Sequence, residues 1–287
     1  MRYRIQHHTQ YRYQQPVILR SHTLHLRPRS DAAQQLWRFN LDVSPTPQQQ
    51  SSLVDVGGNQ VLGLWFAPEP TAQLTIVTTA EVETYRTNAF DYLAEPWAVT
   101  LPFDYPTALA ANLYAYLHAP LYPAPAPGVV DLAQNLLHQV NGNAGLFLTA
   151  LTQRIYETCE YITRPTGRPW SPGITWGKKM GSCRDLTVLF MEACRCVGLA
   201  ARFVSGYEEG DSTISDRDLH AWAEVYVPGG GWRGFDPTHG LAVTDRHIVL
   251  VASAFPAQTI PVIGSTEAGA RVTSSLDTEV KVQVIEA

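Results

Sequence analysis

The stretch HAWAEVYVPGGGWRGFD, residues 220–236, decides the fold of the second half of this chain. Two runs of strand-forming residues flank a Pro-Gly-Gly-Gly turn, which is typical of a β-hairpin. If Pro228 marks the tip, His220 and Asp236 are both eight residues from it and emerge on the same face. Opposed residues of two antiparallel strands have Cβ atoms roughly 4.5–5.5 Å apart. The pattern therefore predicts an imidazole bonded to a carboxylate.

The stretch GSCRD, residues 181–185, places Cys183 at the predicted start of a helix that ends near Gly198. The free N–H groups and positive dipole end at this position stabilise a thiolate and an oxyanion. Taken singly, Cys183 also fits a buried apolar residue, His220 a core histidine and Asp236 a turn residue before proline. Together, and in this order, they predict a catalytic triad in which His220 activates Cys183 and Asp236 orients the imidazole.

Other residues near the predicted triad have candidate roles in lining the site. Ser182 lies beside the nucleophile, and the Cys183 N–H is the first candidate donor to an oxyanion. The indole N–H of Trp176 is a second candidate donor, although tryptophan more often packs than donates. Trp222 shares the strand face of the histidine and either shields the site from water or packs in the core. Glu224, next on that face, either supports the residues of the site from behind or is solvated, and we favour the solvated position.

The remaining sequence predicts an α+β protein. Residues 3–13 alternate between two faces, and further alternating runs are separated by turn signals, which favours an antiparallel β-sandwich-like domain. From residue 129 the period changes to that of helices, which precede the strands near the predicted hairpin. We divide the chain into a β-rich domain, a connecting segment with one helix, an α+β core with a helix-start cysteine, and a C-terminal extension with a final strand: 1–90, 91–128, 129–255 and 256–287.

Composition excludes several classes of protein. The chain has 287 residues, a net charge of −5 and no long basic run, so we expect no nucleic-acid partner. No signal peptide is visible, and no stretch approaches the roughly 20 apolar residues of a membrane span. Four cysteines are too few for a disulfide framework. We therefore expect a cytoplasmic enzyme that does not bind a membrane. The sequence does not indicate an oligomeric state.

The blocks that predict the triad resemble the bacterial transglutaminase-like family, within the papain-like cysteine peptidase superfamily. The resemblance is carried by residues 181–185, 198–207, 220–225 and 231–238, and in the N-terminal region by residues 7–17, 28–29 and 55–59. It implies a β-rich leader domain followed by a transglutaminase-like core. It places the family's nucleophile, base and orienting acid on Cys183, His220 and Asp236.

One segment departs from the family's pattern. After residues 249–252 such proteins tend to carry a Gly-Arg-Asp-aromatic run, whereas this chain continues Ser253-Ala254-Phe255-Pro256. The resemblance implies that this segment lines the edge of the site in relatives, so specificity is expected to differ in this chain.

The expected function is acyl transfer from a peptide or protein amide through a thioester on Cys183. Resolution of the thioester by water gives a cysteine protease or amidase, which we favour. Resolution by a primary amine gives a transglutaminase. A non-catalytic protein-binding scaffold is a further alternative, although no triad residue is lost. An acyltransferase with a nucleotide-bearing thioester cofactor lacks the expected phosphate-binding loop.

No cofactor and no metal are expected from the sequence. A metal site of Cys183, His220, Asp236 and His239 is conceivable from the residue types, but the ligands lack a recognised zinc spacing. No calcium-binding loop of the D-x-D-x-D-G kind is found either.

Overall fold

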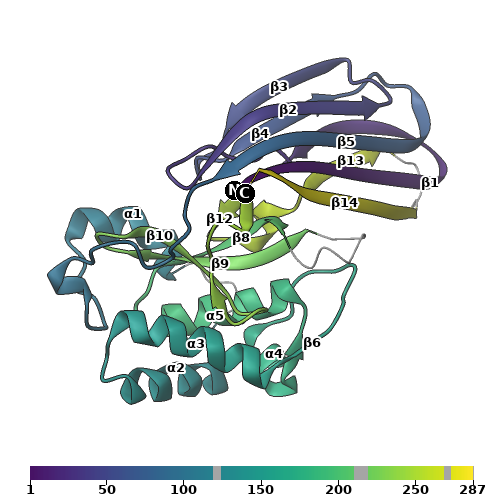
Figure 1. Ribbon diagram of the computed structural model, residues 1–287. Coiled ribbons are helices and arrows are strands. Elements are labelled where there is room, and N and C mark those ends of the chain that lie inside the picture. The colour runs from purple at the N-terminus through teal and green to yellow at the C-terminus, as the bar shows by residue number, and fades with distance from the viewer. Residues whose placement is uncertain (119–123, 210–218, 268–272, 287) are drawn as a thin grey trace.

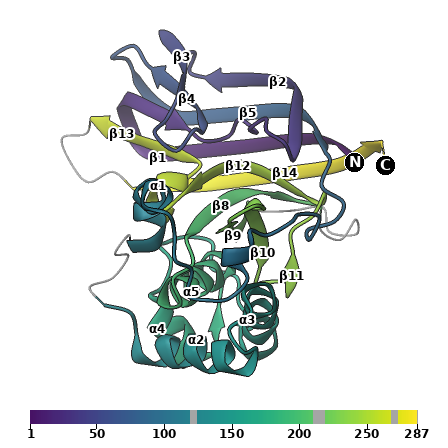
Figure 2. The same ribbon diagram turned by 90° about the vertical axis from the view of Figure 1, so that its left-hand side faces the viewer.

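The protein is described from a computed structural model, which defines residues 1–118, 124–209, 219–267 and 273–286. Two antiparallel sheets lie against each other, and a group of helices covers the outer face of the second sheet (Figure 1, Figure 2). This arrangement confirms the predicted α+β class. No helix among the described residues is long and apolar enough to cross a membrane. The cytoplasmic location stays a prediction.

The first sheet is curled and contains seven strands. In the order β2-β5-β1-β4-β3, with β13 and β14 also paired to β1, the strands are β1 (Arg2–Leu24), β2 (Gln34–Ser44), β3 (Gln49–Val54), β4 (Gln60–Trp65), β5 (Pro70–Thr84), β13 (Val262–Glu267) and β14 (Ser274–Glu286). The alternation predicted for residues 3–13 is visible at the start of β1, where Tyr3, Ile5 and His7 are buried and Arg4 is exposed. One face of the sheet is therefore apolar and needs a partner layer.

The C-terminal strands return to the first strand of the chain. Antiparallel pairing places Arg2 opposite Glu286 and Tyr13 opposite Ser274. The two ends of the chain lie side by side (Figure 1). Residues 262–267 and 274–286, which the sequence analysis places in an extension, thus complete the first sheet.

The helices follow in the middle of the chain. They are η1 (Pro96–Ala98), α1 (Thr107–His118), α2 (Pro127–Gln139), α3 (Ala144–Thr158), α4 (Pro172–Lys178), α5 (Cys183–Cys196) and the later turn η2 (Pro256–Thr259). The side chain of Asn143 caps α3 by accepting from the Leu146 N–H at 2.9 Å. The short helix α4 lies in a stretch rich in glycine, proline and tryptophan. Ser171 as the cap and Pro172 in the first turn explain why so short a helix forms.

The second sheet carries the predicted hairpin at its centre. Its order is β11-β10-β9-β8-β12, from strands β8 (Ala201–Glu208), β9 (His220–Val227), β10 (Gly231–Asp236), β11 (Leu241–Ala242) and β12 (His247–Ser253). A short parallel pair, β6 (Glu160–Tyr161) and β7 (Met180–Gly181), lies just before α5.

The second sheet is covered on both faces. One face packs on α5 in a core that includes Leu189, Ala223 and Val225. On the other face, Tyr207 and Ile248 belong to a second core shared with the first sheet. Burial of these apolar surfaces is the main force that holds the layers together.

Polar contacts fix how the first sheet sits on the second. The Gln34 amide bonds both the N–H and the C=O of Val249, at 2.7 and 3.0 Å. The Asn59 amide does the same to Ala252, at 2.9 and 3.0 Å. These amides satisfy backbone groups of β12 that face the first sheet.

Candidate active site

Cys183 is the first residue of α5, as predicted. Its N–H belongs to the first turn, where N–H groups have no acceptor within the helix. The turn before it is fixed by Asp185, whose Oδ2 accepts from the Ser182 N–H at 2.8 Å and from its hydroxyl at 2.7 Å. Ser182 therefore acts as the N-cap of the helix that Cys183 begins.

Asp185 is fully buried and is held as a carboxylate. Burial alone would raise its pKa, but hydrogen bonds from Arg164, the Trp170 N–H and Ser182 lower the pKa below its usual value. The Arg164 guanidinium lies 2.6 and 2.7 Å from the two carboxylate oxygens. A short network thus sets the position of the helix start that carries Cys183.

The hairpin brings His220 to Asp236, but not in the predicted register. Gly234 pairs with Glu224 and Phe235 with Ala223, so continuing the ladder places Asp236 opposite Trp222 rather than His220. The tip lies one residue later than predicted because Gly229 and Gly231 adopt positive φ angles of 84° and 70°. A shift of two residues keeps the same face.

The diagonal arrangement still gives a direct contact. The Nε2 atom of His220 lies 2.8 Å from Oδ2 of Asp236. The Cys183 side chain also hydrogen-bonds His220 and contributes to the raised pKa of that residue. Because Nε2 is taken by the carboxylate, Nδ1 is the ring atom left for Cys183. The structure therefore brings all three residues predicted as the triad together.

The environment of His220 favours its charged form. Burial would lower its pKa, but the charge and hydrogen bond of Asp236 and the contact with Cys183 raise it well above the usual value of 6.5. The pKa of Asp236 moves the other way. Burial would raise that pKa, and the neighbouring histidines hold it well below its usual range. The pair is therefore stable as an imidazolium and a carboxylate.

Two further histidines share the Asp236 carboxylate, and the sequence analysis gave neither this role. Oδ2 lies 2.9 Å from Nδ1 of His239 and 3.2 Å from Nε2 of His247. Oδ1 accepts from the Thr238 N–H at 2.8 Å. His239 lies three residues after the aspartate, a spacing that could have suggested the contact. His247 begins β12, and only its tertiary placement reveals it.

Glu208 is the fourth side chain beside this group. It ends β8 and pairs with His247 in the ladder between β8 and β12. One of its oxygens lies 3.3 Å from Nδ1 of His239, and the other 3.7 Å from Nε2 of His220. Nothing in the local sequence marks this glutamate, because the contact joins segments far apart in the chain.

The two tryptophans predicted to line the site, Trp222 and Trp176, lie in different environments. Trp222 is fully buried and stacks on His220, with ring centroids 6.1 Å apart. Its indole N–H has no hydrogen-bond partner among the described residues. Trp176 is half-buried on α4, with the Lys179 ammonium over its ring. Its predicted role as an oxyanion donor stays a prediction.

Glu224 differs from the prediction. It is 4% exposed and bonds Arg202 at 2.7 Å and Arg29 at 3.0 Å. Burial would raise its pKa, but the two guanidinium groups lower the pKa to about 2. The expectation of a solvated side chain was wrong because the segment between β1 and β2, which supplies Arg29, covers this face.

The segment that departs from the family's pattern lies away from the triad. Ser253 ends β12, whereas His247 begins it, so the two are roughly 20 Å apart at about 3.3 Å per residue. The Ala254 carbonyl accepts from Arg195 near the end of α5, opposite the end that carries Cys183. In this chain the segment does not line the site.

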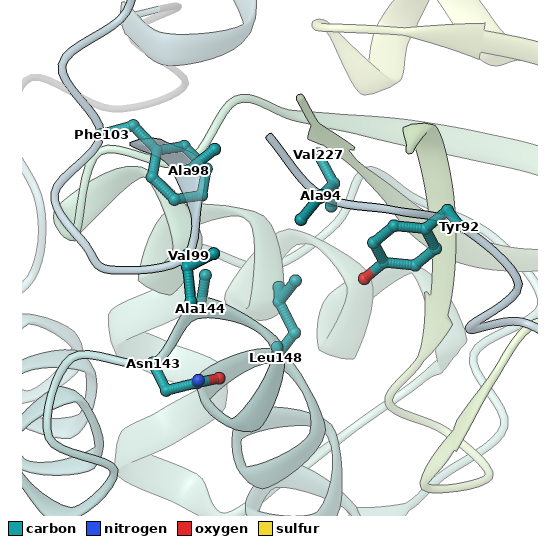
Figure 3. Close-up of a pocket in the computed structure, with 10 residues that line it drawn as sticks. Tyr92, Ala94, Ala98, Val99, Phe103, Asn143, Ala144, Leu148 and Val227 are labelled. Atoms are coloured by element: carbon teal, nitrogen blue, oxygen red, sulfur yellow. The ribbon is translucent and has the colours of Figure 1, made fainter. Parts of the chain in front are cut away.

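A separate cavity of roughly 170 Å³ lies between the connecting segment and α3 (Figure 3). Its lining is mainly apolar and includes Ala98, Val99, Phe103, Leu148 and Val227. None of the predicted site residues lines it. It does not contribute to the chemistry of the triad.

Comparison with known proteins agrees with the architecture. Residues 3–83 match the bacterial transglutaminase-like N-terminal region, and residues 130–237 match the transglutaminase-like superfamily. The chain is similar to an uncharacterized protein of Mycobacterium tuberculosis, at 29% identity over 270 residues, which cover 87% of this chain and 82% of the relative.

Two further relatives differ in how much they cover. A protein-glutamine gamma-glutamyltransferase of Pseudomonas aeruginosa is 28% identical over 116 residues, which cover 37% of this chain and 17% of that protein. The crystal structure of a candidate cysteine protease from Cytophaga hutchinsonii has a TM-score of 0.75 and 20% identity, and covers all of this chain (100%) and 91% of its own. The latter likeness supports the fold.

Proposed function

The chain belongs to the transglutaminase-like superfamily, and on that premise we propose that it hydrolyses peptide or protein amide bonds through a thioester on Cys183. In this proposal Cys183 is the nucleophile, His220 the general acid and base, and Asp236 the group that orients the imidazole. Transglutaminase-like enzymes act on protein or peptide substrates, which supports this substrate class for the chain.

The observation that carries the proposal is the shared position of His220. Its Nε2 lies 2.8 Å from a fully buried carboxylate oxygen, and its ring also bonds the thiol at the start of α5. A charged imidazole held between a carboxylate and a thiol favours the thiolate. The first turn of α5 adds N–H groups directed at the place where negative charge develops.

The first half of the reaction forms the thioester. The sulfur of Cys183 attacks the amide carbon, the S–C bond forms, and the carbonyl oxygen becomes an oxyanion near the Cys183 N–H. The C–N bond then breaks, and the departing nitrogen takes the proton from Nδ1 of His220. The amine leaves, and the acyl group stays on sulfur.

The second half releases the acyl group. Nδ1 of His220, now without its proton, accepts one from water as the water oxygen attacks the thioester carbon. The S–C bond breaks, and a carboxylic acid leaves. The thiolate and imidazolium are restored.

Transamidation is the second candidate, with a primary amine in place of water. The similarity to the Pseudomonas gamma-glutamyltransferase over 116 residues supports transamidation as an alternative. The likeness to the Cytophaga structure, described as a candidate cysteine protease, is in keeping with hydrolysis. A scaffold without activity is less well supported, because all three predicted residues are present and in contact.

The first test is thiol labelling across pH, before any substrate is known. We expect iodoacetamide to label Cys183 faster than the other cysteines at every pH tested, and more slowly in His220→Ala. Cys196 is a matched thiol within the same chain. Burial and the neighbouring Glu192 raise its pKa to about 11, so it should stay unlabelled where Cys183 reacts.

Mass spectrometry of the labelled peptides separates these sites, and Cys183→Ala identifies the signal. Equal labelling of Cys183 and Cys196 at each pH would overturn the proposed nucleophile. With an activated thiol established, peptide libraries incubated with and without a primary amine distinguish hydrolysis from transamidation by product mass.

A further inference from the structure

We propose that Glu208, His220, Asp236 and His239 bind one divalent transition-metal ion such as Zn²⁺, and that this ion reversibly inhibits the enzyme. The binding part of this inference stands alone, whereas the inhibition rests on the proposed function. The four residues come from the end of β8, the start of β9, the end of β10 and the turn after β10.

The positions of the donor atoms fit a single ion. One ligand atom from each residue lies within 4.8 Å of all the others. The closest pairs are His220 Nε2 and His239 Nδ1 with Asp236 Oδ2, at 2.8 and 2.9 Å. Tetrahedral zinc with bonds of about 2.0–2.1 Å keeps its ligands about 3.3 Å apart. The ion therefore requires the shortest pairs to separate by only a few tenths of an ångström.

The chemistry of the donors also fits. Two imidazole nitrogens and two carboxylates form a set that suits zinc and its neighbours among the transition metals. On binding, the ion displaces the protons from the two ligating imidazole nitrogens to solvent, so affinity should fall at acid pH. The two neutral imidazoles and two carboxylates then give the ligand set a charge of −2, which favours a dication. The His239 side chain is 44% exposed and Glu208 is 19% exposed, so an ion from solvent has a path to the buried pair.

Neighbouring groups hold the ligands in place. Oδ1 of Asp236 accepts from the Thr238 N–H, which leaves Oδ2 for the ion. His247 is 2% exposed at its side chain and lies 3.2 Å from Oδ2. Such contacts to a ligating carboxylate fix its orientation, and their loss typically weakens metal binding 10–100-fold.

Inhibition follows from the position of one lone pair. The ion would take the lone pair of His220 Nε2, so the single ring proton must lie on Nδ1. Nδ1 is the atom left for Cys183 and for the water that resolves the thioester. A ring that already carries its proton there cannot accept another, so the second half of the reaction stops until the ion leaves.

The test measures binding in the Cys183→Ala variant of the full chain, so that the thiol contributes nothing. Zn²⁺ alone is titrated in competition with a chromogenic chelator, and Co²⁺ absorption reports coordination. We expect one ion per chain and a loss of affinity of about tenfold or more in Glu208→Gln and in His239→Gln, both made in the Cys183→Ala background. Glu157→Gln and His118→Gln remove the same groups from exposed helix positions and should leave affinity unchanged.

Absence of binding, or equal binding in all four substitutions, would overturn the inference and leave these residues as a hydrogen-bond network only. Because the Cys183→Ala chain is inactive under the proposed function, that result would not bear on catalysis. Conversely, if Cys183 proves unreactive in the labelling test, the proposed function fails, but the inference that these residues bind a metal ion is unaffected. In the active chain, Zn²⁺ should lower turnover, and a chelator should restore it.

Discussion

The Nε2 atom of His220 lies 2.8 Å from Oδ2 of Asp236, although the two residues are not directly opposed in their hairpin. The same oxygen is shared with His239 and His247. One buried carboxylate therefore organises three imidazoles, of which only His220 also contacts the candidate nucleophile.

Replacing Asp236 by Asn should preserve the shape of the site and remove its charge. The imidazolium of His220 then loses its main electrostatic support, so turnover should fall roughly 10²–10⁴-fold. Kinetics on a substrate found with the wild type, and the pH dependence of Cys183 labelling, measure this. Turnover within twofold of the wild type would contradict the role given to Asp236.

Stability should depend on pH through His220. Its pKa in the folded protein is raised above 6.5, so its contribution is fully present below about pH 6.5 and is lost as pH rises toward the folded pKa. The free energy of unfolding should therefore fall above about pH 6.5, more steeply in the wild type than in His220→Gln. His239 is shifted in the same direction, so His239→Gln should remove a further part.

Acid should act through Asp236. Its pKa is held below the usual 3.8, so its contribution is present above that pH and is lost as pH falls toward the folded pKa. Denaturant unfolding measured across pH tests both the loss of stability at high pH through His220 and the loss at low pH through Asp236. Parallel pH curves for wild type and His220→Gln would show that the pair does not carry the dependence.

Arg202→Met should be strongly destabilising, because it leaves the buried Glu224 with only one of its two guanidinium partners. Breaking a buried ion pair costs about 3 kcal/mol. The matched control is Arg20→Met, since the Arg20–Glu267 pair is more than half exposed on both sides, at 58% and 54%. An exposed pair contributes about 1 kcal/mol or less. Equal losses in the two variants, measured by chemical denaturation, would contradict this account.

Gly206→Ala should disturb the site through Trp222. An added Cβ would meet the Ile248 carbonyl and lie 2.6 Å from Cη2 of Trp222, the ring that stacks on His220. Overpacking of this kind costs about 1–3 kcal/mol, and displacement of the ring should lower turnover as well. In Gly177→Ala the new methyl meets nothing within 4 Å, so that helix position should be neutral or slightly stabilised. A fully active and stable Gly206→Ala chain would exclude this packing constraint.

The sequence predicts the local parts of the site well, for physical reasons. Cys183 begins a helix because Ser182 and Asp185 form its cap, and this signal lies within four residues. The strands of the hairpin follow from alternation and from a glycine-rich turn. Its register was wrong by two residues because the turn geometry depends on the φ angles of Gly229 and Gly231.

Contacts between distant segments were not predictable in this way. Glu208 and His247 meet Asp236 only because β8, β10 and β12 belong to one sheet. Glu224 was wrongly expected in solvent because its cover, including Arg29, comes from the other end of the chain. Periodicity identifies the face of a strand, but it does not identify the layer that packs on that face.

Strands β8 and β12 of the second sheet pack against the first sheet. Apolar cores lie on both faces of the second sheet, and the side-chain amides of Gln34 and Asn59 bond the backbone of β12. The superfamily match ends at residue 237, before β12 begins. A fragment cut at that boundary would lose β12, the buried edge strand of the second sheet, and expose Tyr207. We expect the whole protein to unfold in one cooperative thermal transition. The boundary between the two family matches is therefore not a boundary between independently stable units.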